Sequence, residues 1–213
     1  TWMFGRDLAN YDVNFTWAKW VTPSRDLIQT FQNEGDTKRF SQSVVYYTTT
    51  WSNYYPSTNY PFMFKFRSAF SSIIKLRYAD ILLMRAEALV ESGGMNATEW
   101  NRTIRPLRVR AGFTDNRALE YPSTADLRKI IRQERRSELA FEGLRHKDIM
   151  RWKIADQVLN GWAHGLFTGD VAGTDNGFVR VENRNFDPAK HYLWPIPQSE
   201  RDLNKNLTQN PEW

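Results

Sequence analysis

Residues 134–152 read ERRSELAFEGLRHKDIMRW, and this stretch decides the fold. It holds three glutamates, four arginines, an aspartate and a closing tryptophan, and Gly143 divides it. We expect one helix before the glycine and a second helix from Leu144 to Trp152. When helical spacing is counted from Leu127, the core-facing positions include both apolar and acidic residues. They are Ile130, Ile131, Glu134, Glu138, Phe141 and Glu142.

Carboxylates on the apolar face of a helix need charged partners, because an unpaired buried charge costs several kcal/mol. Arginines within the stretch, together with Arg108 and Arg110 upstream, can supply them. We therefore predict a buried ion-pair network that serves folding. Its predicted members are Glu87, Glu134, Arg135, Glu138, Glu142, Arg145, Asp148 and Arg151.

Four further segments carry recognisable patterns. Residues 76–88 read LRYADILLMRAEA, residues 105–112 read RPLRVRAG, and residues 22–28 read TPSRDLI. The tail, residues 192–213, reads YLWPIPQSERDLNKNLTQNPEW. Together with residues 134–152, these segments resemble the motifs of the SusD/RagB family of outer-membrane nutrient-binding lipoproteins. Asp80, Pro106, Glu212 and Trp213 depart from the family's usual residues.

The resemblance implies a mainly α-helical fold, an α/α superhelix of tetratricopeptide-like hairpins with small β-hairpin elements and long loops. It implies that residues 1–213 are the C-terminal part of a longer lipoprotein. Residues 1–70 would form a variable, aromatic-rich region of loops and strands, and residues 71–213 a helical region that holds the motifs. The lipidated cysteine and further helices would then lie outside this piece.

The same resemblance implies a function. Family members capture an oligosaccharide at the cell surface and deliver it to a SusC-like, TonB-dependent outer-membrane transporter, and they break no bond. The expected location is the outer membrane, through an N-terminal lipid anchor outside this piece. We expect no enzyme activity, no cofactor and no metal.

Composition narrows the possible classes of protein. The chain has 213 residues, enough for a sizeable core, with 29 basic and 24 acidic residues and a net charge of +5. Because acids alternate with the basic residues, the charge indicates ion pairing rather than a nucleic-acid-binding face. There is no cysteine, which excludes disulfides and thiolate chemistry. No apolar run reaches the roughly 18 residues of a transmembrane helix.

Local patterns predict the remaining elements. Ser24 is suited to cap a short helix that Gly35 ends, and residues 44–50 and 63–67 have strand composition. Residues 76–91 are apolar nearly all round, as in a central buried helix, and a partner helix is expected over 97–111. Ser123 or Thr124 would cap the helix that contains the glutamates. Residues 165–190 are expected to form a loop with a short strand at 178–181.

Catalytic patterns are absent from the sequence. Glu134, Glu138 and Glu142 invite comparison with glycosidase carboxylates, but a general acid needs a raised pKa. The arginine-rich surroundings should lower the pKa of these groups instead. His146, His164 and His191 lack the spacing of a helical zinc site, and no phosphate-binding glycine loop occurs.

Aromatic residues are the stronger indication of function, because Trp and Tyr stack on the apolar faces of sugar rings. Phe, Trp and Tyr together make up 15% of the chain. The loop 51–61 combines them with turn formers, and Trp17 and Trp20 precede the first helix. The alternative is that these aromatics only cover the core. The predicted glycan-binding residues are Trp17, Trp20, Trp51, Asn53, Tyr54, Tyr55 and Tyr60.

Two other functions stay open at the level of the sequence. One is a helical glycoside hydrolase that uses Glu138 or Glu142. The other is a relative of the same family that binds a peptide or another nutrient, or that acts as a scaffold for protein interactions.

Overall fold

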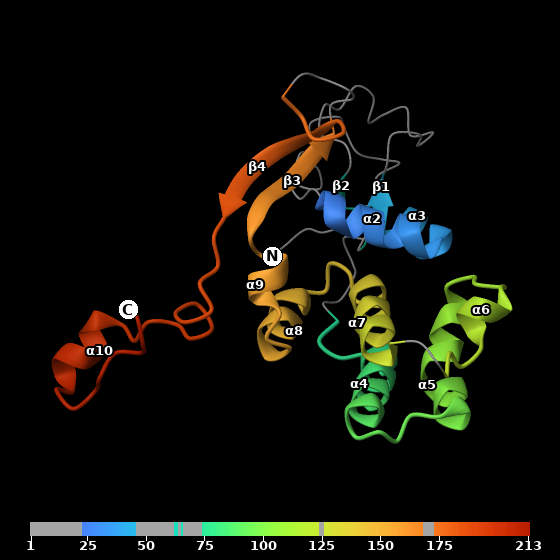
Figure 1. Cartoon of the computed structure of the whole chain (residues 1–213), viewed down its shortest axis with the longest axis horizontal. Helices are drawn as coiled ribbons and strands as arrows, with labels where there is room; N and C mark the ends of the chain where they lie inside the picture. Colours follow the sequence, from blue (N-terminus) through green and yellow to red (C-terminus); the bar gives the residue numbers. More distant parts are fainter. Residues whose placement is uncertain (1–22, 46–61, 64, 66–73, 124–125, 168–172) are drawn as a thin grey trace.

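Most of the secondary structure is helical. Figure 1 shows the computed structural model, which describes residues 23–45, 62–63, 65, 74–123, 126–167 and 173–213. Within these ranges helices dominate, and the strands form two small antiparallel pairs. The prediction of a mainly α-helical fold with small β-hairpin elements is confirmed.

Three helices build the main core. Helix α4 (Tyr78–Glu91) packs against α5 (Ala97–Arg110) and against α7 (Leu127–Glu138), and the short α6 (Asn116–Leu119) follows α5. Figure 1 shows α4 and α7 side by side, with α5 next to them. Apolar side chains from all three long helices form one buried cluster, which includes Leu83, Ala86, Trp100, Ile104 and Ile131.

The predicted helical hairpin over residues 76–111 is present as α4 and α5. Gly93 adopts a positive φ of 73° directly after α4, a conformation that glycine adopts without strain. Asn96 then caps α5, because its side-chain oxygen accepts a hydrogen bond from the Glu99 N–H at 3.0 Å. The turn therefore reverses the chain within a few residues and sets the two helices against each other.

One face of α4 is open, which corrects the expectation of burial all round. Tyr78, Ile81 and Met84 are 74%, 41% and 42% exposed, whereas Leu83 and Ala86 are fully buried. The helix packs only on the side that faces α5 and α7, so its composition is more apolar than its burial in this chain requires.

Helices α2 (Arg25–Glu34) and α3 (Thr37–Ser43) form a second layer beside α7. Ser24 caps α2, and Gly35 ends it in the left-handed region, as predicted. Strand β1 (Val44–Val45) pairs with β2 (Phe62–Met63) in antiparallel register. The rest of the two strands predicted over 44–50 and 63–67 lies outside the described residues, except for Lys65.

Helix α7 is shorter than expected. It begins after Asp126, whose carboxylate accepts from the Lys129 N–H, so the predicted cap at Ser123 or Thr124 is wrong. It ends at Glu138, and Phe141 has a φ of 64° in the left-handed region. Glu142 therefore lies in the following turn and not one helical turn beyond Glu138. Because the helix ends early, the backbone carbonyls of this turn are accessible to side chains from other segments.

A β-hairpin follows the short helices α8 (Arg145–Arg151) and α9 (Ala155–Val158). Strands β3 (Gly161–Phe167) and β4 (Phe178–Arg184) pair antiparallel with a shifted register near His164. The region 165–190 was expected to be a loop with one short strand, so β3 was missed. Its sequence, GWAHGLF, contains two glycines, which lower strand propensity, and the pairing with β4 compensates for them.

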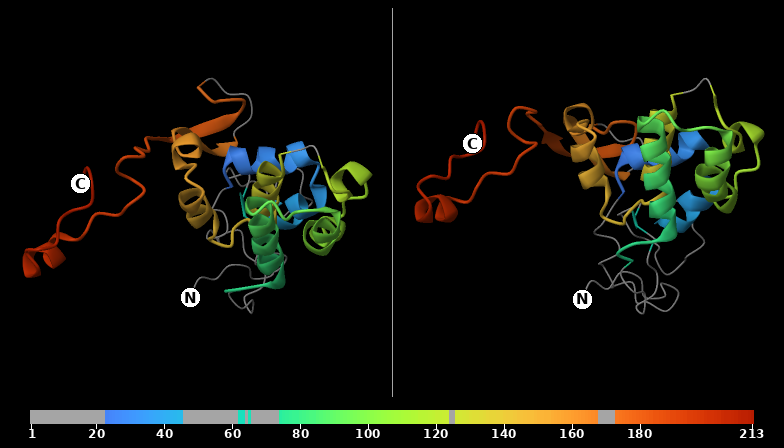
Figure 2. Two further views of the ribbon diagram at one scale, coloured as in Figure 1. Left: turned by 60° about the horizontal axis from the view of Figure 1, so that its bottom comes forward. Right: turned by 90° about the horizontal axis from the view of Figure 1, so that it is seen from below.

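The C-terminal tail extends away from the helical body. Figures 1 and 2 show the segment after β4, with α10 (Gln198–Leu203), projecting from the rest of the molecule. Contacts within the tail fix its shape: the Gln209 side chain bonds both the N–H and the carbonyl of Ile196, at 2.8 and 3.0 Å. Trp194 is 76% exposed.

Trp100 is the residue on which the main core depends most. It is fully buried in α5, and its indole Nε1 donates to the Leu119 carbonyl at 2.9 Å. Trp100→Ala should lower the free energy of unfolding by about 3–5 kcal/mol, because it leaves a cavity and an unpaired carbonyl. Chemical denaturation measures this value. Val109→Ala on the same helix, at a side chain 51% exposed, should change stability by less than about 0.5 kcal/mol.

Candidate functional site

The three glutamates of residues 134–142 lie at the centre of a buried ion-pair network. Glu134 accepts from Arg108 Nε at 2.8 Å and from Arg39 Nη1 at 2.6 Å. Glu138 accepts from Arg77 Nη1 at 2.5 Å, from Arg39 and from Arg110. Both glutamate side chains are almost fully buried, with 2% and 3% of their surface exposed. Two of these partners, Arg39 and Arg77, were not identified from the sequence.

The turn after α7 is held by two cations from the segment before α4. Lys65 Nζ lies 2.5 Å from Glu142 Oε1 and also donates to the Ala140 carbonyl at 3.0 Å. Arg77 donates to both Glu142 oxygens at 2.8 Å and to the Glu138 carbonyl at 2.6 Å. These bonds satisfy the carbonyls that the early end of α7 exposes, and they join residues far apart in the sequence.

A second ion-pair network involves Arg135 of α7. Arg135 donates to Asp148 at 2.8 Å and also bonds Asp80. Arg151 pairs with Glu87 and, at 3.0 Å, with Asp148, and Trp152 Nε1 donates to Glu87 at 2.6 Å. Arg135 and Arg151 thus pair with these carboxylates and not with the three glutamates. The network joins α4, α7 and α8.

The electrostatic setting keeps Glu138 and Glu142 ionised. Burial raises the pKa of Glu138, but the hydrogen bonds from Arg110 and Arg77 outweigh it, so its pKa lies below the ordinary value. The pKa of Glu142 is lowered in the same way by Arg77 and Lys65, against the effect of burial. A group with a lowered pKa is a poor proton donor at neutral pH, which disfavours a role as general acid.

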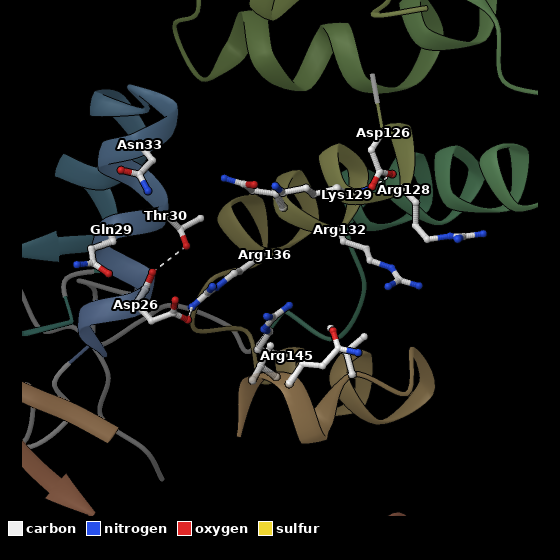
Figure 3. Close-up of a pocket in the computed structure, with 14 residues that line it drawn as sticks. Asp26, Gln29, Thr30, Asn33, Asp126, Arg128, Lys129, Arg132, Arg136 and Arg145 are labelled. Carbon is white, nitrogen blue, oxygen red and sulfur yellow. Dashed lines mark hydrogen bonds and ion pairs between the residues drawn. The ribbon is translucent and has the colours of Figure 1, made fainter. Parts of the chain in front are cut away.

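A cleft lies on the opposite side of α7 from α4, between α2, α7, α8 and α9 (Figure 3). It consists of two adjoining cavities of about 510 Å³ each, which share lining residues. The shared residues are Asp26, Gln29, Arg136, Arg145, Gln157 and Val158. One cavity extends along α7 toward Arg132 and Arg128, and the other reaches strand β3.

The end of the cleft at β3 combines an aromatic ring with polar groups. Trp162 lines it and is 45% exposed, beside Asn160, His164 and Arg184. The Arg180 guanidinium lies 5.5 Å from the Trp162 ring centre, and Arg180 also pairs with Asp175 at 2.7 Å. Asp175 in turn lies 2.6 Å from His164 Nε2. Arg180, Asp175 and His164 are therefore oriented by their contacts with one another. Sequence analysis did not select Trp162, because it assigned no element to residues 153–164 and selected aromatic residues only in the loop 51–61 and before the first helix.

The residues predicted to contact a glycan cannot be compared with this cleft. Trp17, Trp20, Trp51, Asn53, Tyr54, Tyr55 and Tyr60 all lie outside the described residues. Arg145, which was predicted to join the ion-pair network, lines the cleft instead and forms no ion pair with any described residue.

Among the described residues, no group of His, Asp and Glu is arranged to hold a metal ion. In the same ranges, no helix is both long and apolar enough to cross a bilayer.

Glu138→Ala should destabilise the protein by about 3–5 kcal/mol, because it takes one carboxylate from each of the partly buried Arg77 and Arg39 and removes the described ion-pair partner of Arg110. Urea denaturation measures the change. Glu120→Ala, at an exposed position after α6, is the matched control and should cost less than about 0.5 kcal/mol. Equal effects of the two substitutions would contradict a structural role for the Glu138 network.

Stability should also depend on pH in a defined direction. Because the pKa values of Glu138 and Glu142 are lower in the folded state than the ordinary value of 4.5, their contribution is complete above that value. It is lost as the pH falls through the folded-state pKa values. The denaturant concentration at the unfolding midpoint, measured from pH 7 to pH 2, should therefore decrease once the pH drops below about 4.5. The midpoint of the Glu138→Gln variant should decrease less steeply over the same pH range. A midpoint that rises on acidification would contradict this sign.

Comparisons with known proteins agree with the motifs in the sequence. A family model described as the SusD family matches residues 67–213. The SusD-like protein P2 of Formosa agariphila is 33% identical over 149 residues, which are 68% of this chain and 26% of that protein. A solved SusD-like carbohydrate-binding protein from Bacteroides fragilis is also 33% identical, with a TM-score of 0.57 over 71% of this chain and 33% of that one.

A second solved structure supports the fold alone. A SusD homologue from Bacteroides thetaiotaomicron has a TM-score of 0.61 and 23% identity, and the match covers 88% of this chain and 43% of that one. The chain therefore spans between about a quarter and less than half of the length of these relatives. On the match of the family model and the identity to these relatives, the chain belongs to the SusD family.

Proposed function

We propose that this chain is part of a cell-surface protein that binds an oligosaccharide without cleaving it and delivers it to a SusC-like, TonB-dependent transporter in the outer membrane. In this proposal the whole protein is a lipoprotein, anchored through a residue outside the chain described here. The observation that carries the proposal is membership of the SusD family, one relative of which is described as carbohydrate-binding.

The cleft supports sugar binding on physical grounds. Sugar rings have apolar faces that stack on aromatic side chains, and their hydroxyls need hydrogen-bond partners. Trp162 offers a partly exposed ring, while Asn160 and Arg184 offer polar groups in the same cavity. Such a mixture of an apolar surface with a few oriented polar groups is typical of small-molecule sites. We also propose Trp51, Tyr54 and Tyr55 of the loop 51–61 as glycan-binding residues.

The ion pairs of the glutamates favour binding over hydrolysis. A glycosidase needs one carboxyl group that holds a proton at working pH. Glu138 and Glu142 are both surrounded by cations that lower their pKa values. They also hold the turn after α7 in place, so any change that freed them for chemistry would disturb the fold.

The first experiment is a binding screen of the full-length protein against purified polysaccharides, by affinity electrophoresis and calorimetry, with reducing-sugar release measured in parallel. Binding without release supports capture of a glycan. Binding with release would indicate a hydrolase. Absence of binding to every glycan would contradict glycan capture and favour a peptide or another nutrient.

Trp162→Ala should weaken binding of the glycan identified in that screen by about tenfold, equivalent to roughly 1.4 kcal/mol, because the stacking surface is lost. Its thermal unfolding midpoint should stay close to that of the unchanged protein, since the ring is 45% exposed. Trp194→Ala, an exposed tryptophan in the C-terminal tail, is the control and should bind normally. Unchanged affinity of the Trp162 variant would remove this cleft from the binding site.

A further inference from the structure

The part of the cleft along α7 has more cations than the described carboxylates can neutralise. Its charged lining consists of Arg128, Lys129, Arg132, Arg136 and Arg145 against Asp26 and Asp126. Two of the cations are paired, Arg128 with Glu91 and Arg136 with Asp26. The other three form no ion pair with any residue that the structure describes. Lys129 is exposed, whereas Arg132 and Arg145 are half-buried; because most buried charges among the described residues are paired, the two arginines stand apart.

The surroundings of Arg145 disfavour its positive charge. Burial, and then the neighbouring charge of Arg136, lower the pKa of its guanidinium to about 10. Asp26 and Asp148 oppose this effect only partly. An arginine is ordinarily charged at any pH at which proteins are studied. The Arg145 side chain is therefore a cation in surroundings that disfavour a positive charge.

Arg132 adds an unsatisfied donor in the same cavity. Its Nε is buried and has no hydrogen-bond partner among the residues that the structure describes, although its guanidinium stacks on Trp152 at 4.9 Å. Buried polar groups nearly always have partners, so each exception calls for a missing acceptor. Arginine binds carboxylate and sulfate oxygens in a forked geometry, and both groups accept from several donors at once.

We propose that the cleft binds the anionic group of an acidic sugar, a carboxylate or a sulfate ester, between Lys129, Arg132 and Arg145. The inference rests on the proposed function and narrows it to acidic glycans. Arg145 lines both cavities. In this proposal the anionic group lies in the cavity along α7, and a neighbouring sugar ring of the same glycan lies in the other cavity, against Trp162. The three cations then contribute affinity and select against neutral sugars.

The test uses the arginine Nε–Hε signals of the full-length protein in NMR spectra, assigned by substitution. The probes are glucuronate, glucose 6-sulfate, inorganic sulfate and glucose, at constant ionic strength. We expect glucuronate or glucose 6-sulfate to shift the Arg132 and Arg145 signals saturably and at a lower concentration than inorganic sulfate. Three results would overturn the proposal: shifts of equal size with glucose, shifts with inorganic sulfate alone, or no shift with any probe.

Arg145→Met separates binding from structure. It should abolish the shift of the Arg132 signal by the acidic sugar while the thermal unfolding midpoint stays the same or rises, because a poorly solvated cation has been removed. Arg102→Met is the matched control: its side chain is 66% exposed on α5, and both properties should stay unchanged. A fall in the unfolding midpoint together with normal sugar binding would show that Arg145 is structural, and would overturn the proposal.

Failure of this inference and failure of the proposed function give different results. Binding of neutral oligosaccharides, without shifts from the acidic sugars, leaves glycan capture intact and removes the anion site. Shifts from the acidic monosaccharides, without affinity for any oligosaccharide, keep the anion site and remove glycan capture.

Discussion

The pairing of Glu138 with Arg77 is the interaction on which the rest of the fold depends. Arg77 lies at the N-terminal end of α4, and through Glu138 and Glu142 it ties that end to the last residues of α7 and the turn beyond them. Arg39 of α3 and Arg110 of α5 reach the same carboxylate. One buried charge thus connects four helices. Its removal would leave Arg110 without an ion-pair partner among the described residues and would take one carboxylate from each of Arg39 and Arg77.

The distribution of paired and unpaired charge separates the frame from the candidate site. Beside α4 and α5, nearly every buried charge that the structure describes has a partner, and the pKa values of Glu138 and Glu142 are lowered, which favours ionisation. On the other side of α7, Arg145 is buried against another cation and Arg132 keeps an unsatisfied donor. The charged groups of structural ion pairs find their partners within the protein. Groups that line a cavity without a partner are available to bind a ligand.

The sequence predicts local structure well where one residue type has one physical reason to be present. Ser24 and Gly35 mark the ends of α2, and the helices expected over 76–91 and 97–111 are present as α4 and α5. The sequence predicts local structure less well where residues far away along the chain determine the conformation. The left-handed Phe141 ends α7 early because Lys65 and Arg77 hold the next turn, and neither residue is near it in the sequence. Strand β3 forms in a glycine-containing segment because β4 pairs with it.

The same distinction applies to the site. Periodicity placed acidic residues on the core face of the helix, but it could not reveal that Arg39 and Arg77 bind them or that Arg145 faces a cleft. A double-mutant cycle with Arg77→Met and Glu138→Gln tests most directly whether this pair holds the fold together. We predict a coupling of about 2 kcal/mol or more in the free energy of unfolding. Effects that add to within roughly 0.5 kcal/mol would show that the two residues act independently, and would contradict the central role assigned to their ion pair.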